Sequence, residues 1–339
     1  MIDLLVAGAG PVGLVAAIHA AQSGLEVVVV EPRSEPMDKA CGEGLMPGAL
    51  AHLAAIGVDP YGHPFHGIRY LAGERVAEAR FTRGPGRGVR RIELQRALRD
   101  KADDLGVRVV PGRVDVIDEG DGWIEAAGMT SRYLIGADGL HSQVRRTLGL
   151  APARARGRRF GVRQHFCVRP WTDMVEVYWL SDAELYVTPV GENVVGVAVL
   201  GTAPIDLPAA IGRVPELADR LSGVPVASTP RGAGPLRQRV TARRSGRALL
   251  VGDAAGYVDA LTGEGLRVGF EEAEAAVRAI ASGEPETYEA DWRRITRSYR
   301  WLTHALLWTT SRRALRPLVV PSAHAMPVAF RRIVDGLAY

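Results

Sequence analysis

A strand–helix–strand pattern with spaced glycines opens the sequence and constrains its fold more than any other feature. The segment reads IDLLVAGAGPVGLVAAIHAAQSGLEVVVVEPR, with an apolar run at 2–7, a run of small residues at 11–23 and a second apolar run at 27–30. Apolar runs of strand length on both sides of a helical pattern predict a βαβ unit. The chain is therefore expected to begin with parallel strands covered by a helix.

The three glycines of this unit have the spacing of a dinucleotide site. Gly8 allows a tight turn, Gly10 lets the backbone approach a pyrophosphate, and Gly13 lets the helix pack closely on the strand. Glu31 follows Gly10 by 21 residues, at the end of the second strand, where a carboxylate can accept hydrogen bonds from ribose hydroxyls. Strand, glycines, helix, strand and acid in this order predict dinucleotide binding rather than a chance glycine-rich turn.

Two later stretches each place an aspartate where a strand ends. In YLIGADGLHSQVRRTLG (133–149) the strand stops at Asp138 and Gly139, and a helix begins near Ser142. In ALLVGDAAGYVDALTGEGLRVGFEEAEAAVRAI (248–280) the strand ends at Gly252 and Asp253, and a helix begins near Gly265. The carboxyl edge of an open α/β sheet is where ligands bind, so both aspartates are expected at one site.

These motifs together resemble the FAD-dependent class A monooxygenases, which are similar in fold to para-hydroxybenzoate hydroxylase. The match runs from Ile2 to about Ile280. It implies that Asp253 contacts the ribityl or pyrophosphate part of FAD, that Asp138 and Gly139 shape the cofactor site, and that Arg91 contacts the cofactor. The alternatives are that the aspartates only cap helices and that Arg91 is a surface charge.

The resemblance implies an α/β fold: a Rossmann-type FAD-binding domain with an interleaved antiparallel β-sheet substrate domain and C-terminal helices. We expect the FAD-binding domain at 1–66, 88–157 and 245–283, the substrate domain at 67–87 and 158–244, and a helical region at 284–339, broken at Pro317, Pro321 and Pro327. Besides the residues named above, the cofactor is expected to contact Arg33, Cys41, Gly42, Gly252, Gly263 and Gly265.

Within this superfamily the finer matches diverge. The stretches KACGEGL and VDALTGEGL are more similar to geranylgeranyl reductases and flavin-dependent halogenases, since Gly256 and Ala260 stand where aromatic hydroxylases carry histidine and proline. Of the reductase signature Y-x-W-x-F-P, however, the segment 184–189 keeps in kind only Tyr186 and Pro189. The halogenase signature W-x-W-x-I-P is missing as well.

Candidate catalytic residues are Cys41, His165 and Glu264, and candidate substrate contacts are Arg163, His165, Trp179 and Tyr186. Each has a structural alternative: Cys41 as a small packing residue, His165 as a hydrogen-bonded strand residue, and Glu264 as an acid that favours a helix N-terminus. The aromatic residues on the predicted strands at 158–200 could equally be core.

The leading functional hypothesis is an NAD(P)H-dependent monooxygenase of a small aromatic or polyketide-like molecule of secondary metabolism, acting through a C4a-hydroperoxyflavin. The alternatives are a flavin-dependent double-bond reductase of an apolar substrate and a non-catalytic protein on the same scaffold. No second glycine motif for a nicotinamide occurs, so NADH or NADPH is expected to bind transiently, or a flavin reductase or other electron donor supplies the electrons.

Composition limits the partners. The sequence has 339 residues with two cysteines, Cys41 and Cys167, whose spacing fits neither a disulfide framework nor a metal site, and it has no stretch of eighteen apolar residues. We therefore expect a cytoplasmic protein with no transmembrane segment. Between 293 and 339 nine arginines face one acid, Asp335. A solvated helix face is the preferred interpretation; weak membrane-surface contact or a lipid-like or carrier-bound substrate is the alternative, and no nucleic-acid motif is present.

Overall fold

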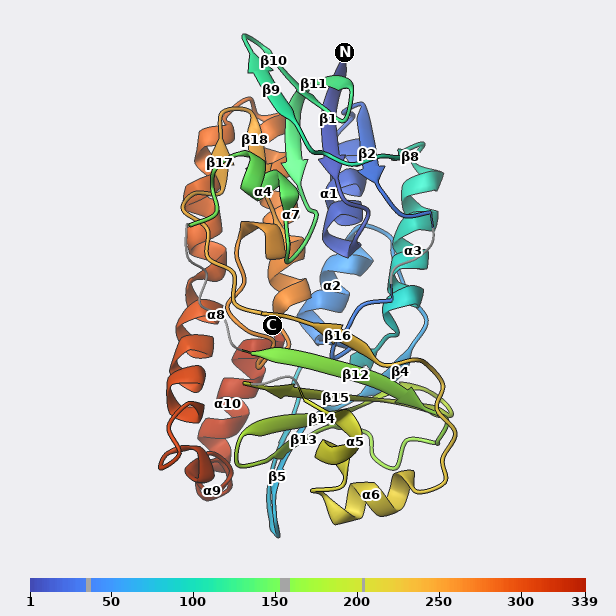
Figure 1. The fold of residues 1–339 in the computed structure, drawn as a ribbon, viewed down its shortest axis with the longest axis vertical. Helices are drawn as coiled ribbons and strands as arrows, with labels where there is room; N and C mark the ends of the chain where they lie inside the picture. Colours follow the sequence, from blue (N-terminus) through green and yellow to red (C-terminus); the bar gives the residue numbers. More distant parts are fainter. Residues whose placement is uncertain (35–37, 153–158, 203–204) are drawn as a thin grey trace.

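The computed structural model describes residues 1–34, 38–152, 159–202 and 205–339. Its largest sheet has eight strands, six of them in the order β17-β18-β11-β1-β2-β8 (Figure 1). The run from β18 to β8 is parallel. The strands are β1 (Ile2–Ala7), β2 (Val27–Glu31), β8 (Arg108–Pro111), β9 (Ile117–Gly120), β10 (Trp123–Ala126), β11 (Met129–Gly136), β17 (Arg244–Ser245) and β18 (Ala248–Leu250).

The helices of this part pack on the parallel strands in one apolar core. Helix α1 (Pro11–Gln22) lies between α3 (Arg91–Asp104) and α7 (Gly265–Ala281). All five residues of β2 are buried, which explains why its first four residues, 27–30, form a continuous apolar run rather than an alternating one. The predicted βαβ unit is confirmed in β1, α1 and β2. Shorter elements are α2 (Pro47–Ala55), α4 (Gln143–Thr147) and the 3₁₀ helix η1 (Gly252–Ala255).

A second sheet of seven strands has the order β16-β12-β15-β14-β13-β5-β6 and lies below the first part in Figure 1. Its pairs are antiparallel except β5 with β13, which is parallel. Its strands are β5 (Gly67–Ala72), β6 (Arg75–Arg80), β12 (Phe160–Phe166), β13 (Val175–Trp179), β14 (Ala183–Gly191), β15 (Val194–Gly201) and β16 (Arg231–Ala233). The four strands expected at 158–200 are therefore present as β12 to β15.

The two faces of this sheet have different covers. Helices α5 (Leu207–Ile211) and α6 (Pro215–Leu221) cover one face, where alternate residues such as Leu185 and Val187 are buried. The other face contacts the C-terminal helices through Val177 and Trp179. A small third sheet has the strand order β3 (Gly44–Leu45), β7 (Gly86–Gly88), β4 (His63–Phe65).

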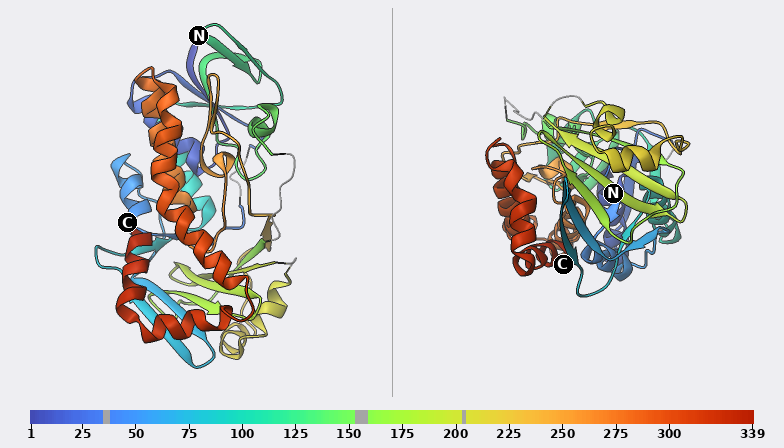
Figure 2. Two further views of the ribbon diagram at one scale, coloured as in Figure 1. Left: turned by 90° about the vertical axis from the view of Figure 1, so that its left-hand side faces the viewer. Right: turned by 90° about the horizontal axis from the view of Figure 1, so that it is seen from below.

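The C-terminal region is helical, as expected. It comprises η2 (Pro285–Thr287), α8 (Tyr288–Thr310), η3 (Arg316–Leu318), α9 (Val319–Ala325) and α10 (Pro327–Ala338). Figure 2 shows α8 running past both large sheets and α9 and α10 wrapping the end of the second. The break expected at Pro321 is wrong, because this proline lies in the first turn of α9, where its missing N–H is not needed.

The domain ranges given above stay a prediction, and the boundary between 157 and 158 falls outside the described residues. None of the helices described combines the length and apolar composition that crossing a bilayer requires.

Candidate functional site

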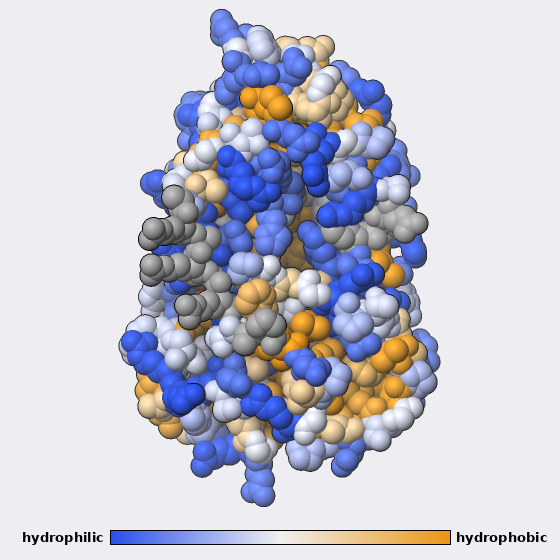
Figure 3. Space-filling model, viewed as in Figure 1, coloured by the Kyte–Doolittle hydropathy of each residue, from blue (hydrophilic) through white to orange (hydrophobic). Residues whose placement is uncertain are grey.

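The predicted cofactor residues meet along one edge of the eight-stranded sheet. Strands β18, β11, β1 and β2 are neighbours and run parallel, so the loops that follow them come together. These loops carry Asp253, Asp138, the glycine triplet and the residues after Glu31. Figure 3 shows the face of the molecule hollowed near its centre, with hydrophilic residues on both sides. We call this region the cofactor cleft.

Glycine is needed at the three positions of the first motif for different physical reasons. A Cβ on Gly8, whose φ is 106°, would lie 2.7 Å from the Ala137 carbonyl oxygen, and one on Gly13 would lie 1.9 Å from the Gly8 carbonyl oxygen. A Cβ on Gly10 would meet nothing within 4 Å. The first two glycines are thus required by the packing of the chain itself, whereas the absent side chain of Gly10 leaves room for a ligand.

Glu31 is held at the end of β2 by backbone groups. Its Oε2 accepts a hydrogen bond of 2.9 Å from the Ala9 N–H, and its Oε1 accepts one of 3.2 Å from the Arg33 N–H. The Arg33 guanidinium forms an ion pair with it at 3.5 Å and is itself half exposed. The carboxylate is therefore fixed beside the glycine turn, with lone pairs left for ribose hydroxyls.

Asp138 caps α4, as the alternative interpretation held. Its Oδ2 accepts from the N–H groups of Gln143 and Val144 at 2.6 and 3.0 Å. Its Oδ1, however, is buried and has no hydrogen-bond partner among the described residues. A cap that leaves one buried oxygen unpaired can still accept a hydrogen bond from a ligand. Gly139 follows with a φ of 81°, in the turn that leads into the helix.

Asp253 lies across the cleft in η1, beside Gly252, whose φ is 61°. Burial raises the pKa of Asp253, and the charges of Lys39, Arg91 and Arg145 act in the opposite direction. Within the described residues no hydrogen bond reaches its carboxylate. The Asp253 carboxylate therefore lies near several cations, but none of the described residues donates a hydrogen bond to it.

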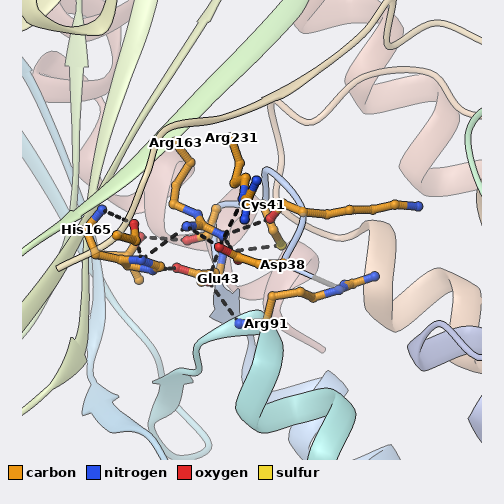
Figure 4. Close-up of polar contacts among 11 residues, drawn as sticks. Asp38, Cys41, Glu43, Arg91, Arg163, His165 and Arg231 are labelled. Atoms are coloured by element: carbon orange, nitrogen blue, oxygen red, sulfur yellow. Dashed lines mark hydrogen bonds and ion pairs between the residues drawn. The ribbon is translucent and has the colours of Figure 1, made fainter. Parts of the chain in front are cut away.

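Lys39 is a cofactor-side residue that sequence reasoning missed. Its Nζ would lie 3.2 Å from a Cβ on Gly139, so its side chain extends from the 38–44 loop to the turn after β11. Burial and the nearby Arg91 charge lower the pKa of Lys39, whereas Asp253 raises it. The signal was present, since Lys39 is the one basic residue of KACGEGL. Arg91 uses its backbone N–H on Glu43, and its side chain extends away from that residue (Figure 4).

Cys41 lies in the same loop as a half-buried free thiol. The Glu43 N–H donates a hydrogen bond of 3.4 Å to its Sγ, and burial raises the pKa of the thiol. Cys41 is therefore kept protonated at neutral pH rather than activated as a thiolate. The next residue, Gly42, has room for a Cβ, and its carbonyl accepts a hydrogen bond of 2.9 Å from Thr188 on β14.

Glu43, also missed from the sequence, joins this loop to the second sheet. Its Oε1 accepts a hydrogen bond of 2.9 Å from the Arg91 N–H, and its Oε2 lies 2.6 Å from His165 Nε2. The Glu43 backbone has a φ of 58°, a conformation that costs a non-glycine residue about 1–3 kcal/mol and needs support from its surroundings. Its buried side-chain contacts supply that support.

Arg163 and His165 complete a buried cluster with Glu43 (Figure 4). His165 Nδ1 lies 3.1 Å from an Arg163 N–H and 2.9 Å from Ser228 Oγ. Because Arg163 only donates and the Glu43 carboxylate only accepts, these contacts place the ring proton on Nε2. Arg163 also forms an ion pair with Asp38 and donates a hydrogen bond of 2.9 Å to the Lys39 carbonyl oxygen. We call Asp38, Glu43, Arg163 and His165 the loop cluster.

The loop cluster contains two of the four residues expected to contact substrate. Arg163 and His165 were predicted to contact substrate, and they are 1% and 0% exposed. Their polar groups bind the 38–44 loop, and contact with a substrate stays a prediction. In this structure they support the loop that borders the cofactor cleft, as the structural alternative for His165 held.

The other two predicted substrate residues, Trp179 and Tyr186, lie farther along the same face of the sheet. The strand register places Arg163, Ala198 and Tyr186 in one row, so their side chains share a face. Tyr186 donates a hydrogen bond of 3.1 Å to the Leu261 carbonyl oxygen. Trp179 packs on Tyr70 with ring centroids 5.2 Å apart, and its buried Nε1 has no partner among the described residues. This part of the face combines apolar side chains with the buried Glu184, which is in register with Trp179 and forms ion pairs with Arg159 and Arg316.

Glu264 precedes α7 and is 2% exposed. Its Oε1 accepts a hydrogen bond of 2.5 Å from Arg267, whereas its Oε2 is buried without a partner in the described part of the chain. Burial raises the pKa of Glu264 to about 7, against the opposing charge of Arg267. Glu264 is therefore a carboxyl group that can hold a proton near neutral pH. It is flanked by Gly263, which has a φ of 73°, and by Gly265, which faces the Tyr257 ring.

These observations fit a bound dinucleotide. Gly10 leaves space at the start of α1, Lys39 brings a cation to the cleft, and Asp138 offers an unpaired buried oxygen. A diphosphate needs the first two groups, and hydroxyl donors suit the third. The described residues contain no cluster of three or more histidine, cysteine or acidic side chains that could hold a metal ion.

Comparison with known proteins identifies the family. Residues 1–293 match the family described as FAD binding domain. The menaquinone reductase of Mycolicibacterium smegmatis is 29% identical, over 97% of this chain and 90% of its own length. The digeranylgeranylglycerophospholipid reductase 1 of Methanopyrus kandleri is 31% identical, over 82% of this chain and 81% of its own.

Solved structures show the same fold at lower identity. A flavoprotein/dehydrogenase from Cytophaga hutchinsonii superposes with a TM-score of 0.83 at 21% identity, over 99% of this chain and 92% of that one. The p-nitrophenol 4-monooxygenase PnpA from Pseudomonas putida superposes with a TM-score of 0.79 at 19% identity, over 99% of this chain and 95% of that one. The chain belongs to the FAD binding domain family and is an FAD-dependent oxidoreductase.

Proposed function

We propose that this protein is an FAD-dependent double-bond reductase of an apolar, isoprenoid-like substrate. The relatives at 29–31% identity that align over most of both chains are named as reductases of menaquinone and of digeranylgeranylglycerophospholipid. This reverses the order of the two enzyme hypotheses favoured by the sequence, and the non-catalytic alternative is not carried further.

The observation that carries the proposal is the polarity of the second sheet's inner face. A hydroxylase of a polar aromatic substrate needs free polar groups to orient it. Here the polar groups of Arg163 and His165 are already paired within the loop cluster, and the Tyr186 hydroxyl donates a hydrogen bond to a backbone carbonyl oxygen. Near Trp179 the charged groups are paired with one another, since Glu184 forms ion pairs with Arg159 and Arg316, and the remaining side chains are apolar. A surface on which most polar groups are already paired offers a phenol few contacts and suits a hydrocarbon chain better.

The chemistry divides between cofactor and protein. When bound, reduced FAD supplies a hydride to one carbon of a double bond and is oxidised in doing so. A proton must then reach the other carbon, so the substrate gains two hydrogens in total. Of the residues predicted above to be catalytic, the Cys41 thiol and the Glu264 carboxyl group can hold a proton near neutral pH. NADH, NADPH or a protein donor is proposed to restore the reduced cofactor.

The C-terminal helices offer a route for an apolar substrate. Of the ten large apolar side chains that are exposed in the described structure, six lie here: Trp301, Trp308, Leu318, Met326, Val328 and Ile333. Arginines are interspersed with them. Apolar and basic side chains on one helical surface favour weak contact with an anionic membrane, from which a lipid-like substrate could be taken.

A monooxygenase of a small aromatic or polyketide-like molecule is the second candidate. The segment 184–189, where geranylgeranyl reductases are expected to carry Y-x-W-x-F-P, reads ELYVTP here, which weakens the reductase proposal at its own signature. The fold is shared with PnpA, and likeness at 19% identity supports only the scaffold.

Product analysis separates the two candidates. The FAD-loaded enzyme would be incubated with menaquinone carrying an unsaturated side chain and, separately, with a digeranylgeranyl glycerophospholipid, with NADH or NADPH, with and without oxygen. The reductase proposal expects a mass gain of two hydrogens without oxygen. A gain of one oxygen atom that requires molecular oxygen would overturn it.

A further inference from the structure

A basic pocket lies outside the cofactor cleft, between the 237–243 segment and α8. Its volume is about 300 Å³. The segment and the helix run along the same side of the molecule in Figure 1. None of the residues predicted to contact FAD lines it. The lining residues are Arg237, Gln238, Arg239, Val240, Arg243, Gly256, Tyr257, Val258, Arg300 and His304.

The lining contains four arginines and a histidine but no acid. One arginine, Arg243, is neutralised by Glu289, which accepts hydrogen bonds of 2.9 and 3.1 Å from its backbone and guanidinium. The other three, Arg237, Arg239 and Arg300, have no carboxylate within 4.0 Å in the part of the chain that the structure describes. The Arg300 guanidinium carbon lies 5.2 Å from the Trp292 ring centroid, and this contact with a neutral ring does not neutralise its charge.

The arginines are held close enough to repel one another. Burial lowers the pKa of Arg237 most, and the positive charges of Arg239 and Arg300 lower it further. The acid that opposes this effect is Asp259, which is already engaged by Arg159 at 2.9 Å and by the Leu261 N–H at 3.1 Å. Uncompensated like charges beside a partly enclosed space are costly unless an anion joins them. A solvated helix face, the preferred interpretation of the C-terminal arginines, does not describe Arg300.

From this geometry we infer that the pocket is a binding site for a phosphate group, either of free diphosphate or of a pyridine dinucleotide. Guanidinium groups bind phosphate oxygens in a bidentate manner, and several converging on one space make a phosphate site. The volume suffices, since a water molecule takes about 30 Å³ and a phosphate group a few times that. Gly256 and Tyr257 belong to the segment that follows η1, so the site is adjacent to the loop carrying Asp253.

Calorimetric titration of the FAD-loaded protein tests this inference. Sodium diphosphate, NADPH and NADH would be titrated in chloride buffer into the wild type, the double variant Arg237→Gln/Arg300→Gln, and the control Arg297→Gln, an exposed arginine of α8 that does not line the pocket. The FAD that stays bound would be measured after each titration by gel filtration and flavin extraction, because NADPH or NADH can itself bleach the 450 nm absorbance by reducing the cofactor.

Diphosphate is expected to bind the wild type, to bind the double variant at least about tenfold more weakly, and to bind the control within about twofold, since charge-assisted hydrogen bonds are lost only in the double variant. If NADPH bound more tightly than NADH, the phosphate group in the pocket would be the 2′-phosphate of NADPH. Equal binding of both would identify the dinucleotide diphosphate, and diphosphate alone would identify a free anion.

Absence of diphosphate binding to the wild type, or equal binding to the double variant, would overturn the inference. The double substitution removes like-charge repulsion, so its melting temperature is expected to match or exceed that of the wild type. If it unfolds, the single variant Arg239→Gln, at an exposed position, is expected to weaken diphosphate binding about threefold, and no change there would contradict the site. Because these titrations need no alkene substrate, their failure is independent of the reductase proposal.

Discussion

The cofactor cleft and the loop cluster both contain buried charges, yet they differ in how completely those charges are paired. In the cleft, Asp138 Oδ1 has no partner and Asp253 has no hydrogen bond among the described residues. In the loop cluster, both carboxylate oxygens of Glu43 and both ring nitrogens of His165 are engaged, and the one buried polar atom without a partner among the described residues is Arg163 Nε. The unsatisfied region is the one that a ligand completes, whereas the satisfied region is a support for it.

The largest expected effect is loss of the loop cluster. Replacing Glu43 by alanine leaves Arg163 and His165 buried without their shared acid, and we expect the free energy of unfolding to fall by about 3–5 kcal/mol. Urea denaturation measures this. The matched control is Glu93→Ala, which removes an exposed ion pair with Arg96 and is expected to cost less than about 1 kcal/mol. If both variants lost the same small amount, the cluster would not be a support.

Glu264 is the intermediate case, a buried acid with one oxygen paired and one not. The folded protein keeps its proton up to a pH of about 7, against a usual pKa of 4.5. Its stabilising contribution is therefore present below about pH 4.5 and is lost as the pH rises to about 7, by roughly 3 kcal/mol at about 1.4 kcal/mol per pKa unit.

The variant Glu264→Gln should remove this part of the pH dependence of stability, and its margin over the wild type should grow between pH 5 and pH 8. Thermal unfolding across that range measures the difference. Glu272, whose pKa burial raises to about 8, is present in both proteins and cancels. Parallel stability curves would contradict the protonated state proposed for Glu264, whereas the exposed control Glu286→Gln should give such curves.

Substitutions at Gly10 and Gly13 distinguish a glycine that leaves space for a ligand from one that the packing of the chain requires. Gly10→Val adds a side chain where the protein has nothing within 4 Å, so the variant should fold normally and bind FAD about a hundredfold more weakly. Gly13→Val should instead destabilise the fold, because its Cβ would overlap the Gly8 carbonyl. Flavin absorbance after gel filtration and the melting temperature report the two effects. Normal FAD affinity in Gly10→Val would mean that the diphosphate lies elsewhere.

The smallest effect concerns the cation that the loop brings to the cleft. Lys39→Met keeps the apolar stem and removes the charge, and FAD affinity should fall about tenfold, as for one charge-assisted contact. Fluorescence titration of the apoprotein with FAD measures it. Lys101→Met, on α3, is the matched control and should leave FAD affinity unchanged; an equal loss in both variants would point to general electrostatics rather than to Lys39.

The difference between these regions also explains what the sequence could predict. The glycine motif, β1, α1 and β2 depend on neighbours within about thirty residues, so their pattern is visible locally. The loop cluster joins Glu43 to His165 across 122 positions, and no local pattern announces such a pair. Sequence reasoning therefore selected Cys41, two residues away, and assigned Arg163 to substrate. Pro321 was misjudged for a related reason, since its effect depends on where α9 begins.

The basic pocket was missed in the same way. The C-terminal arginines were treated as one solvated run, and only packing of α8 on the 237–243 segment distinguishes Arg300 from its exposed neighbours. By contrast, the strands β12 to β15 were predictable because aromatic and β-branched runs alternate with turn residues.

The central claim, that this FAD-dependent oxidoreductase reduces a double bond, is tested most directly by a single anaerobic turnover. The enzyme-bound FAD would be reduced, freed of excess reductant and mixed without oxygen with menaquinone carrying an unsaturated chain or with a digeranylgeranyl glycerophospholipid. Return of the 450 nm absorbance, with one reduced double bond per FAD, is the predicted result. Flavin that stays reduced with both until oxygen enters, followed by oxygen insertion into the added molecule, would contradict it.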